Sequence, residues 1–228
     1  MNTMLKLQGL LPKEYQTKQC TFLRRKFFIG RRVHIPRKNT EPLATLALQY
    51  IERRKRKMNC ADIGTGAGVL AISLALGSKL VKKVFATDIY AGAIWVARRN
   101  IKKFHVDKRI ILKRGDLLWP IRNEKVNLIV ADLPHASTKK FREKPYLALE
   151  HRRATLAGKT GLEIIRLFLK QLVQYPIGKE VSAIFLKIPP GKAKATIRFV
   201  HHYIPSYKLE TRRDEKGKTR YLIALKRL

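Results

Sequence analysis

The fold of this chain is decided by the stretch Asp62-Ile63-Gly64-Thr65-Gly66-Ala67-Gly68. This stretch ends an apolar segment, residues 57–63, and precedes a helical pattern that runs through Leu76. A glycine-rich turn between a strand and a helix lets the backbone approach a ligand closely, since glycine has no side chain there. The stretch therefore predicts a cofactor-binding loop after the first strand of an α/β domain.

Strand and helix patterns alternate along most of the chain. The expected strands are residues 57–63, 83–87, 110–113, 126–131, 181–188, 206–212 and 219–225, and the expected helices are residues 41–57, the segment through Leu76, 91–104, 162–174 and 193–202. The last two strands flank the turn Asp214-Glu215-Lys216-Gly217, as in an antiparallel hairpin. Such alternation predicts a Rossmann-like α/β fold with a mostly parallel seven-stranded sheet, helices on both faces and a C-terminal hairpin.

The first 41 residues interrupt this alternation. We expect residues 1–41 to form a basic N-terminal extension and residues 42–228 the main domain. Within the extension, residues 21–33 alternate apolar and basic side chains, which is typical of short strands or a hairpin. Thr40 is expected to cap the following helix, with Pro42 in its first turn.

The charge of the chain is strongly positive. Its 228 residues include 50 Lys and Arg against 16 Asp and Glu, a formal net charge of +34. Such a surface attracts polyanions, so RNA or the ribosome is a candidate partner, and a general compositional bias is the alternative. The last turn of the first long helix, Arg53 to Lys57, has two interpretations of its own: a solvated helix end that suits cations, or an RNA contact. Hydrophobic residues make up 45% of the chain, which excludes a disordered basic tail.

The sequence lacks the signals of several other classes of protein. Cys20 and Cys60 form no CxxC pair, so neither a disulfide framework nor a metal site is indicated. No stretch reaches the roughly 18 apolar residues that span a membrane, and the N-terminus does not resemble a signal peptide. We therefore expect a cytoplasmic protein that acts as a monomer without a membrane partner.

The spacing of the glycines bears on the identity of the cofactor. A dinucleotide fingerprint is GxGxxG, whereas Val69 stands here where its third glycine would be. The observed pattern, Gly64, Gly66 and Gly68 after an acidic residue, is the one associated with S-adenosylmethionine enzymes. The motif alone leaves the dinucleotide alternative open.

Acidic residues at the next two strand ends strengthen the S-adenosylmethionine interpretation. Asp88 ends the second strand, where a carboxylate can accept hydrogen bonds from both ribose hydroxyls. Its alternative role is to cap the following helix. Asp116 ends the third strand, where its carboxylate can face the adenine amino group and Leu117 can contact the ring. The expected cofactor-binding residues are Asp62, Gly64, Thr65, Gly66, Gly68, Asp88, Ile89, Asp116, Leu117 and Asp132.

At the end of the fourth strand the chain resembles the HemK-type glutamine methyltransferases, enzymes that methylate the glutamine amide of translation release factors. The likeness lies in Ile35-Pro36-Arg37-Lys38-Asn39-Thr40-Glu41 (family IPRPETE), Asp62 to Gly68 (DIGTGSG), Gly115-Asp116-Leu117-Leu118 (SDLF), Leu156-Ala157-Gly158-Lys159-Thr160-Gly161-Leu162 (GGxDGL) and Leu186-Lys187-Ile188-Pro189-Pro190-Gly191 (LEIGxxQ). It covers roughly residues 27–228. Too few residues precede it for the family's N-terminal helical substrate-recognition domain. The resemblance implies a class I S-adenosylmethionine-dependent methyltransferase fold and a protein substrate in the translation machinery.

One departure from the family lies at the expected catalytic corner. The family's Asn-Pro-Pro-Tyr is replaced by Asp132-Leu133-Pro134-His135. In the family, the asparagine oxygen and a backbone carbonyl hold the amide hydrogens of the substrate, and the aromatic ring packs on its plane. By resemblance, Asp132 and the Leu133 and Pro134 backbone position the nitrogen, and His135 stacks on the substrate. Asp132 would also help to remove the proton.

Three functions remain open on the sequence. The first is methylation of a glutamine side-chain amide in a release factor or ribosomal protein. The second is methylation of an exocyclic amine in RNA, because Asp-Pro-Pro-Tyr variants occur in adenine methyltransferases and a flipped adenine presents its amino group much as an amide does. The third is a non-catalytic RNA- or ribosome-binding module whose corner at Asp132 is degenerate.

Overall fold

The structure is a computed structural model that describes residues 11–143 and 150–227. Its elements are α2 (Lys13–Thr17), β1 (Gln19–Phe22), β2 (Arg25–Phe28), η1 (Lys38–Thr40), α3 (Glu41–Arg54), β3 (Met58–Ile63), α4 (Val69–Gly77), β4 (Val81–Asp88), α5 (Ala91–Lys103), β5 (Ile110–Arg114), η2 (Trp119–Ile121), β6 (Leu128–Ala131), β7 (Ala136–Ser137), α6 (Thr138–Glu143), α7 (Arg152–Thr155), β8 (Leu156–Gly158), α8 (Glu163–Gln174), α9 (Ile177–Glu180), β9 (Ala183–Lys187), α10 (Ala193–Tyr203), β10 (Tyr207–Arg213) and β11 (Thr219–Lys226).

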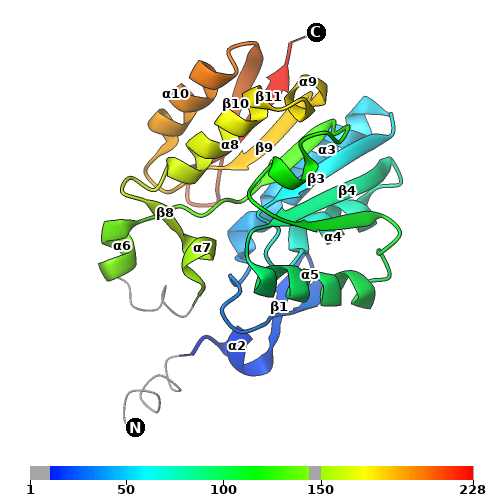
Figure 1. Cartoon of the computed structure of the whole chain (residues 1–228), viewed down its shortest axis with the longest axis vertical. Coiled ribbons are helices and arrows are strands. Elements are labelled where there is room, and N and C mark those ends of the chain that lie inside the picture. The colour runs from blue at the N-terminus through cyan, green and yellow to red at the C-terminus, as the bar shows by residue number, and fades with distance from the viewer. Residues whose placement is uncertain (1–10, 144–149, 228) are drawn as a thin grey trace.

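Seven strands form the main sheet, in the order β10-β11-β9-β6-β3-β4-β5. The pairs β3–β4, β3–β6, β4–β5 and β6–β9 are parallel, whereas β11 runs antiparallel to both β9 and β10. The predicted α/β fold, with a mostly parallel seven-stranded sheet and a C-terminal hairpin, is therefore confirmed. Figure 1 shows the sheet between its helices, with α8 and α10 side by side on one face.

Each face of the sheet carries its own apolar core. Alternate side chains of the central strands belong to different clusters: Val84 and Val130 pack with α3, α4 and α5, whereas Phe85 and Ile129 pack with α8 and α9. This alternation is the period of two that a strand imposes on its side chains. Strands buried on both faces explain why the sequence shows continuous apolar runs rather than polar alternation.

The predicted N-terminal hairpin is part of the larger core. β1 and β2 pair in antiparallel register, and Phe22 and Phe27 are fully buried in the cluster that contains α3, α4 and α5. The side chain of Asn100 on α5 ties this hairpin to the domain, since it donates to the Phe28 carbonyl and accepts from the Phe28 amide. Residues 19–28 are thus packed into the main domain rather than detached from it.

The first long helix differs from its prediction at both ends. α3 ends at Arg54, because Lys55 adopts the left-handed conformation with φ of 48°, so the rest of the basic run lies outside the helix. Thr40 makes no capping hydrogen bond, and the prediction of that role is wrong. Its hydroxyl instead donates to Asp132, 92 residues further along the chain.

The parallel strands end at one edge of the sheet, and this edge positions the candidate site. β3, β4, β6 and β9 lead there into the glycine loop, Asp88, Asp132 and Lys187. Ligands of open α/β sheets bind outside the carboxyl ends of the strands. Both cysteines are buried free thiols. Across residues 11–143 and 150–227, no helix has the length and apolar character needed to cross a membrane.

Candidate active site

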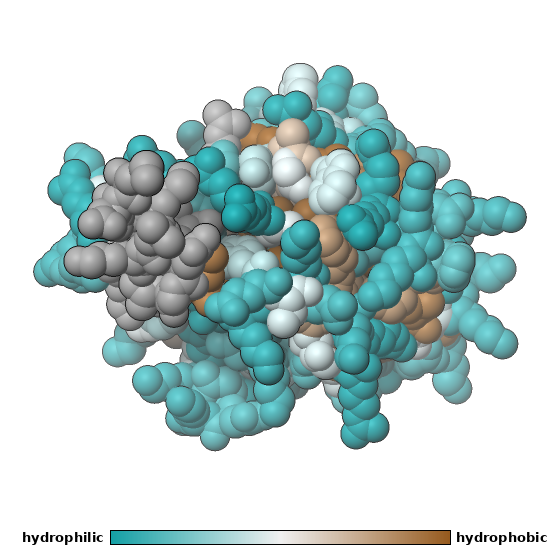
Figure 2. Space-filling model, turned by 90° about the horizontal axis from the view of Figure 1, so that it is seen from below, coloured by the Kyte–Doolittle hydropathy of each residue, from teal (hydrophilic) through white to brown (hydrophobic). Residues whose placement is uncertain are grey.

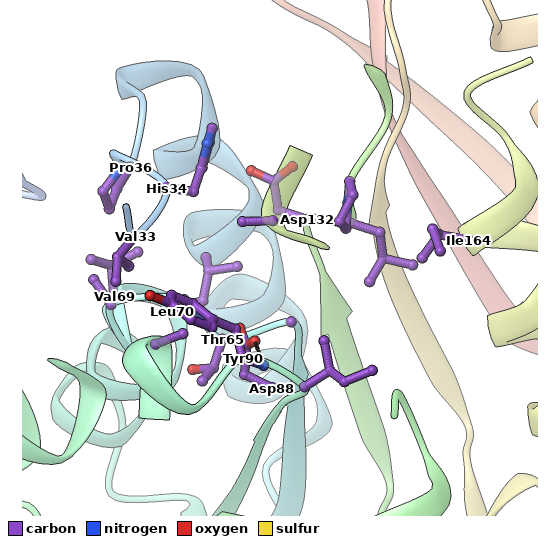
Figure 3. Close-up of a pocket in the computed structure, with 18 of the residues that line it drawn as sticks. Val33, His34, Pro36, Thr65, Val69, Leu70, Asp88, Tyr90, Asp132 and Ile164 are labelled. Carbon is purple, nitrogen blue, oxygen red and sulfur yellow. Dashed lines mark hydrogen bonds between the residues drawn. The ribbon is translucent and has the colours of Figure 1, made fainter. Parts of the chain in front are cut away.

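A pocket with a volume of about 380 Å³ opens at the carboxyl edge of the sheet (Figure 3). We call it the main pocket. It is lined by Val33, His34, Pro36, Thr40, Gly64, Thr65, Gly66, Ala67, Val69, Leu70, Asp88, Ile89, Tyr90, Ala93, Asp116, Leu117, Asp132, Leu133, Pro134, Ala154, Leu156 and Ile164. Four strand ends, those of β3, β4, β5 and β6, therefore meet the segment before α3 around one cavity, as the strand-end motifs predict.

The glycine loop is shaped by backbone hydrogen bonds to the neighbouring strand. The amides of Gly64 and Thr65 both donate to the Thr87 carbonyl at 2.9 Å. Gly64 and Gly66 have φ values of 73° and 54°, which favour glycine. A Cβ on Gly66 would meet no atom within 4 Å, so the space above this residue is open to a ligand. A Cβ on Gly68 would lie 3.4 Å from Ala97 instead, and Gly68 therefore serves close helix packing rather than the pocket.

Asp62 lies behind the loop and is not among the residues that line the main pocket. The carboxylate is fully buried, and its Oδ2 accepts from the Thr65 hydroxyl at 2.7 Å and the Ala71 amide at 3.0 Å. Oδ1 is buried without a hydrogen-bond partner in the part of the chain that the structure describes. Burial raises the pKa of Asp62 to about 7, although both hydrogen bonds oppose this rise. Asp62 thus anchors the loop and reaches a ligand only through it.

Asp88 faces the main pocket from the end of β4. Its Oδ2 accepts from the Gly66 amide and its Oδ1 from the Tyr90 amide, both at 2.9 Å. Burial raises the pKa of this carboxyl, and the two amides only partly offset the rise. Tyr90 also lines the pocket, and its ring stacks on His151 with 4.0 Å between ring centroids. Each carboxylate oxygen retains a further lone pair for a ligand hydroxyl.

Asp116 and Leu117 form the next part of the wall. Gln171 on α8 donates to Asp116 Oδ2 at 3.2 Å, which leaves Oδ1 available to a ligand donor. Leu117 adopts a left-handed backbone with φ of 46° and is held there by the Thr87 hydroxyl, which donates to its carbonyl at 2.9 Å. Such a backbone persists only where the surroundings impose it, and it is frequent at ligand sites. Here it presents the leucine side chain to the pocket.

These residues fit S-adenosylmethionine. Asp88 offers acceptors for two ribose hydroxyls, Asp116 an acceptor for the adenine amino group, and Ile89 and Leu117 apolar contact for the ring. The open space at Gly66 leaves room for the rest of the molecule. This cofactor supplies a methyl group already activated on a sulfonium, so the protein needs to provide orientation rather than a metal or a covalent nucleophile.

The predicted catalytic corner contains a buried ion pair. Lys187 Nζ lies 2.8 Å from Asp132 Oδ2 and 2.7 Å from Thr40 Oγ1, and that hydroxyl donates to the same Oδ2 at 2.7 Å. The side chain of Lys187 is 3% exposed and that of Asp132 is 15% exposed. Both contacts to Asp132 involve Oδ2, and no donor from the described residues contacts its Oδ1. The remaining oxygen is available to an N–H of the substrate.

The ion pair corrects the expected role of Asp132 as a proton acceptor. Burial by itself would raise its pKa, but the charge and hydrogen bond of Lys187, the charge on His34 and the Thr40 hydroxyl outweigh burial and lower the pKa to about 2. A carboxylate with so low a pKa takes up a proton poorly at neutral pH. Asp132 can hold and orient an N–H group, but it is a weak base.

A second cavity adjoins the main pocket at Asp132. We call it the side chamber; its volume is about 220 Å³ and its residues are His34, Arg37, Asn39, Asp132, Leu133, Pro134, His135, Ala136, Lys140, Ala154, Thr155, Lys187, Pro190 and Arg220. His135 lines this chamber and not the main pocket. Its Nδ1 lies 3.2 Å from the Leu133 carbonyl, the group expected to hold the second substrate hydrogen, and burial lowers the pKa of the ring. A flat ring with a lowered pKa therefore borders the side chamber.

Sequence reasoning missed the residues that complete the corner. Thr40 was assigned to a helix cap and Lys187 only to a family resemblance, although both contact Asp132. His34 lines both cavities and lies 2.7 Å from Glu150. Contacts over 55 to 147 residues leave no local pattern in the sequence. The only available signal was charge: a lysine at the end of an apolar strand beside an aspartate at the end of another.

Comparisons with known proteins agree with this geometry. A family model described as ribosomal protein L11 methyltransferase (PrmA) matches residues 40–144. A release factor glutamine methyltransferase of Bacillus cereus is 31% identical over 220 residues, which cover 94% of this chain and 76% of the relative. One from Dictyoglomus turgidum is 32% identical, with 93% of this chain and 74% of the relative covered.

Solved structures share the fold at lower identity. A ribosomal protein L11 methylase from Lactobacillus delbrueckii subsp. bulgaricus superposes with a TM-score of 0.60 at 21% identity, covering 86% of this chain and 82% of that one. The hMettl16 catalytic domain gives a TM-score of 0.64 at 12% identity, with coverage of 97% and 91%. Fold and site together define a class I methyltransferase that uses S-adenosylmethionine as its methyl donor. More particularly, the chain belongs to the family of release factor glutamine methyltransferases.

Proposed function

We propose that this methyltransferase modifies the side-chain amide of a glutamine in a protein of the translation machinery, a release factor or a ribosomal protein. The observation that supports the proposal best is the position of Asp132, between the main pocket and the side chamber, with Oδ1 available. An amide that enters through the chamber can donate one hydrogen to Oδ1 and thereby point its nitrogen at the main pocket. The names of the relatives support glutamine as the substrate. The cytoplasm, where translation takes place, is the expected compartment.

Each site residue then has a separate task. Gly64, Thr65 and Gly66 form the floor for the cofactor, and Asp88 holds its ribose. Asp116, Leu117 and Ile89 bind the adenine, and Leu133 with Pro134 borders the nitrogen. Holding two reacting atoms in line replaces a bimolecular encounter by a prearranged one, which is the main contribution expected of such a site.

The direct test is the fate of a labelled methyl group. The protein and labelled S-adenosylmethionine are incubated in three separate samples, with release factors, with ribosomes or with protein-free RNA. Each product is then digested with protease or with nuclease. We expect label that survives nuclease, is released by protease and is recovered as methylated glutamine after complete hydrolysis. Label that survives protease and is lost to nuclease would overturn the glutamine assignment.

A second candidate is methylation of an exocyclic amine in RNA. It is favoured by the side chamber, in which the side chains of Arg37, Lys140, Lys187 and Arg220 outnumber the carboxylate of Asp132. A base amine would use the same Oδ1 acceptor as an amide does. The protein-free RNA sample of the same experiment separates the two candidates.

A further inference from the structure

The side chamber has a cationic lining that the transfer of a methyl group does not require. Arg37, Lys140, Lys187 and Arg220 contribute to its wall, and Asp132 is the carboxylate among its lining residues. The charge of Asp132 is already matched by Lys187 at 2.8 Å. The guanidinium groups of Arg37 and Arg220 thus add positive charge to the chamber wall beside the point where the substrate nitrogen must lie.

Arg220 is the most informative of these cations. It comes from β11, and only 5% of its surface is exposed. Its Nε is buried without a hydrogen-bond partner, and its guanidinium forms no hydrogen bond with the described residues. The carboxylate of Asp214 lies 3.9 Å from Nε, beyond hydrogen-bond distance. A buried Nε–H without a hydrogen-bond acceptor is costly even with a carboxylate nearby, and each such group in a folded protein requires an explanation.

A bound anion supplies that explanation. Arginine matches the geometry of phosphate oxygens with two parallel N–H donors, and such charge-assisted bonds are among the strongest hydrogen bonds. The rest of the surface favours a polyanion as the source of the phosphate. The chain has a net charge of +34, and hydrophilic side chains dominate the face in Figure 2, with apolar groups in patches between them. A strand of RNA fits both the chamber and this surface.

We propose that the side chamber is an RNA phosphate site, with Arg220 as its central ligand and Arg37 at its exposed side. The phosphate lies next to Asp132, so the enzyme receives its substrate nitrogen together with an RNA strand. The site goes beyond the proposed function, because it operates whether the methylated nitrogen belongs to a glutamine of a release factor or ribosomal protein in contact with RNA, or to the RNA itself.

The test measures binding of a short fluorescent single-stranded RNA to the full chain without S-adenosylmethionine, over a range of salt concentrations. The variants are Arg220→Met and Arg37→Gln, and Arg56→Gln, an exposed residue after α3, is the matched control. Loss of the central phosphate contact in Arg220→Met should weaken RNA binding about tenfold. It should also make the slope of log affinity against log salt shallower by about 0.7. Arg37→Gln should act in the same direction and Arg56→Gln much less.

Thermal unfolding separates a binding role from a structural one. If Arg220 serves a ligand, Arg220→Met should melt at the temperature of the wild type or above it, because an unsatisfied buried charge has been removed. RNA should raise the melting temperature of the wild type and not that of the variant. A large fall in melting temperature without RNA, or equal RNA binding by Arg220→Met and Arg56→Gln, would overturn the proposal. So would competition by a polyglutamate peptide that equals RNA of the same charge, since the ligand would then be a carboxylate.

Discussion

Lys187 Nζ lies 2.8 Å from Asp132 Oδ2, and both side chains are almost completely buried at the carboxyl edge of the sheet. The family has an asparagine where this chain has Asp132, and a glutamate in the segment that contains Lys187. The aspartate adds one negative charge, and the lysine replaces a negative charge by a positive one. The lysine therefore lets an aspartate occupy the corner with its charge matched, while one oxygen still accepts a hydrogen bond, as the amide oxygen of asparagine does.

Removal of this lysine should make activity depend on pH. In the wild type the pKa of Asp132 is about 2, so its protonation does not affect activity above about pH 4. In Lys187→Gln the burial of Asp132 remains and its principal counter-charge is lost, so the pKa of the carboxyl rises. We expect methyl transfer by the variant to be weak in mild acid and to recover as pH rises, with S-adenosylmethionine affinity unchanged. The measurement is the pH profile of kcat/KM, with the exposed Lys108→Gln as control; parallel profiles for all three proteins would contradict the role of Lys187.

The stability of the same variants gives a second prediction. A depressed carboxylate pKa contributes stability above the unfolded pKa of 3.8, and this contribution is lost as pH falls toward 2. Lys187→Gln leaves Asp132 buried without its partner and should cost about 3 kcal/mol of unfolding free energy at neutral pH. The double variant Asp132→Asn with Lys187→Gln carries no charge there and should recover most of this loss. Urea unfolding of the wild type, the two single variants and the double variant measures the four unfolding free energies. If the loss in the double variant equals the sum of the two single losses, the pair is not coupled.

The glycine loop gives a prediction about the cofactor. Gly66→Val places a side chain in the open space above the loop, where it would collide with a bound ligand. We expect it to weaken S-adenosylmethionine binding at least about tenfold. Gly217→Val is the matched control, because its φ of 72° and empty surroundings impose similar strain far from the pocket, in the β10–β11 turn. Calorimetric titration of both variants checks the prediction. Equal affinity in the two variants would mean that the ligand does not lie over Gly66.

Asp62 should make the protein less stable as the solution becomes neutral. Its folded pKa of about 7 exceeds the unfolded value of 3.8, so its stabilising contribution is complete below about pH 4 and is lost as pH rises through 7. Asp62→Asn cannot ionise and lacks this dependence. The difference in unfolding free energy, wild type minus variant, should therefore fall by up to about 4 kcal/mol between pH 4 and pH 8. A difference that stays constant over that range would place the pKa of Asp62 near its ordinary value.

Much of the fold could be predicted from the sequence because its signals are local. Apolar runs of strand length, helical periodicity and the glycine loop each arise within a few residues, and the parallel sheet follows from their alternation. Element ends were less accurate. β6 begins at Leu128 rather than Val126, and α3 ends at Arg54 without a glycine to mark its end.

For the candidate site, too, residues with a local sequence signal were predicted and residues that depend on long-range packing were not. Strand-end residues such as Asp88 and Asp116 were identified because parallel strands bring their carboxyl ends to one edge. Asp62 and Gly68 were assigned to cofactor contact. In the structure Asp62 holds the loop and Gly68 packs against α5, since backbone geometry decides which loop atoms face the pocket. The contacts of Thr40 and Lys187 with Asp132 depend on how distant elements pack, and a single sequence carries no record of that packing.

The central claim, that methyl transfer takes place at Asp132 beside a separately formed cofactor site, is tested most directly by Asp132→Ala. Transfer of label to the translation protein and equilibrium binding of S-adenosylmethionine are measured on the same preparation, with the exposed Asp107→Ala as control. We expect transfer to fall at least about 100-fold, because the substrate nitrogen loses the acceptor that orients it, while S-adenosylmethionine affinity changes little. Transfer at the wild-type rate by Asp132→Ala would contradict the account.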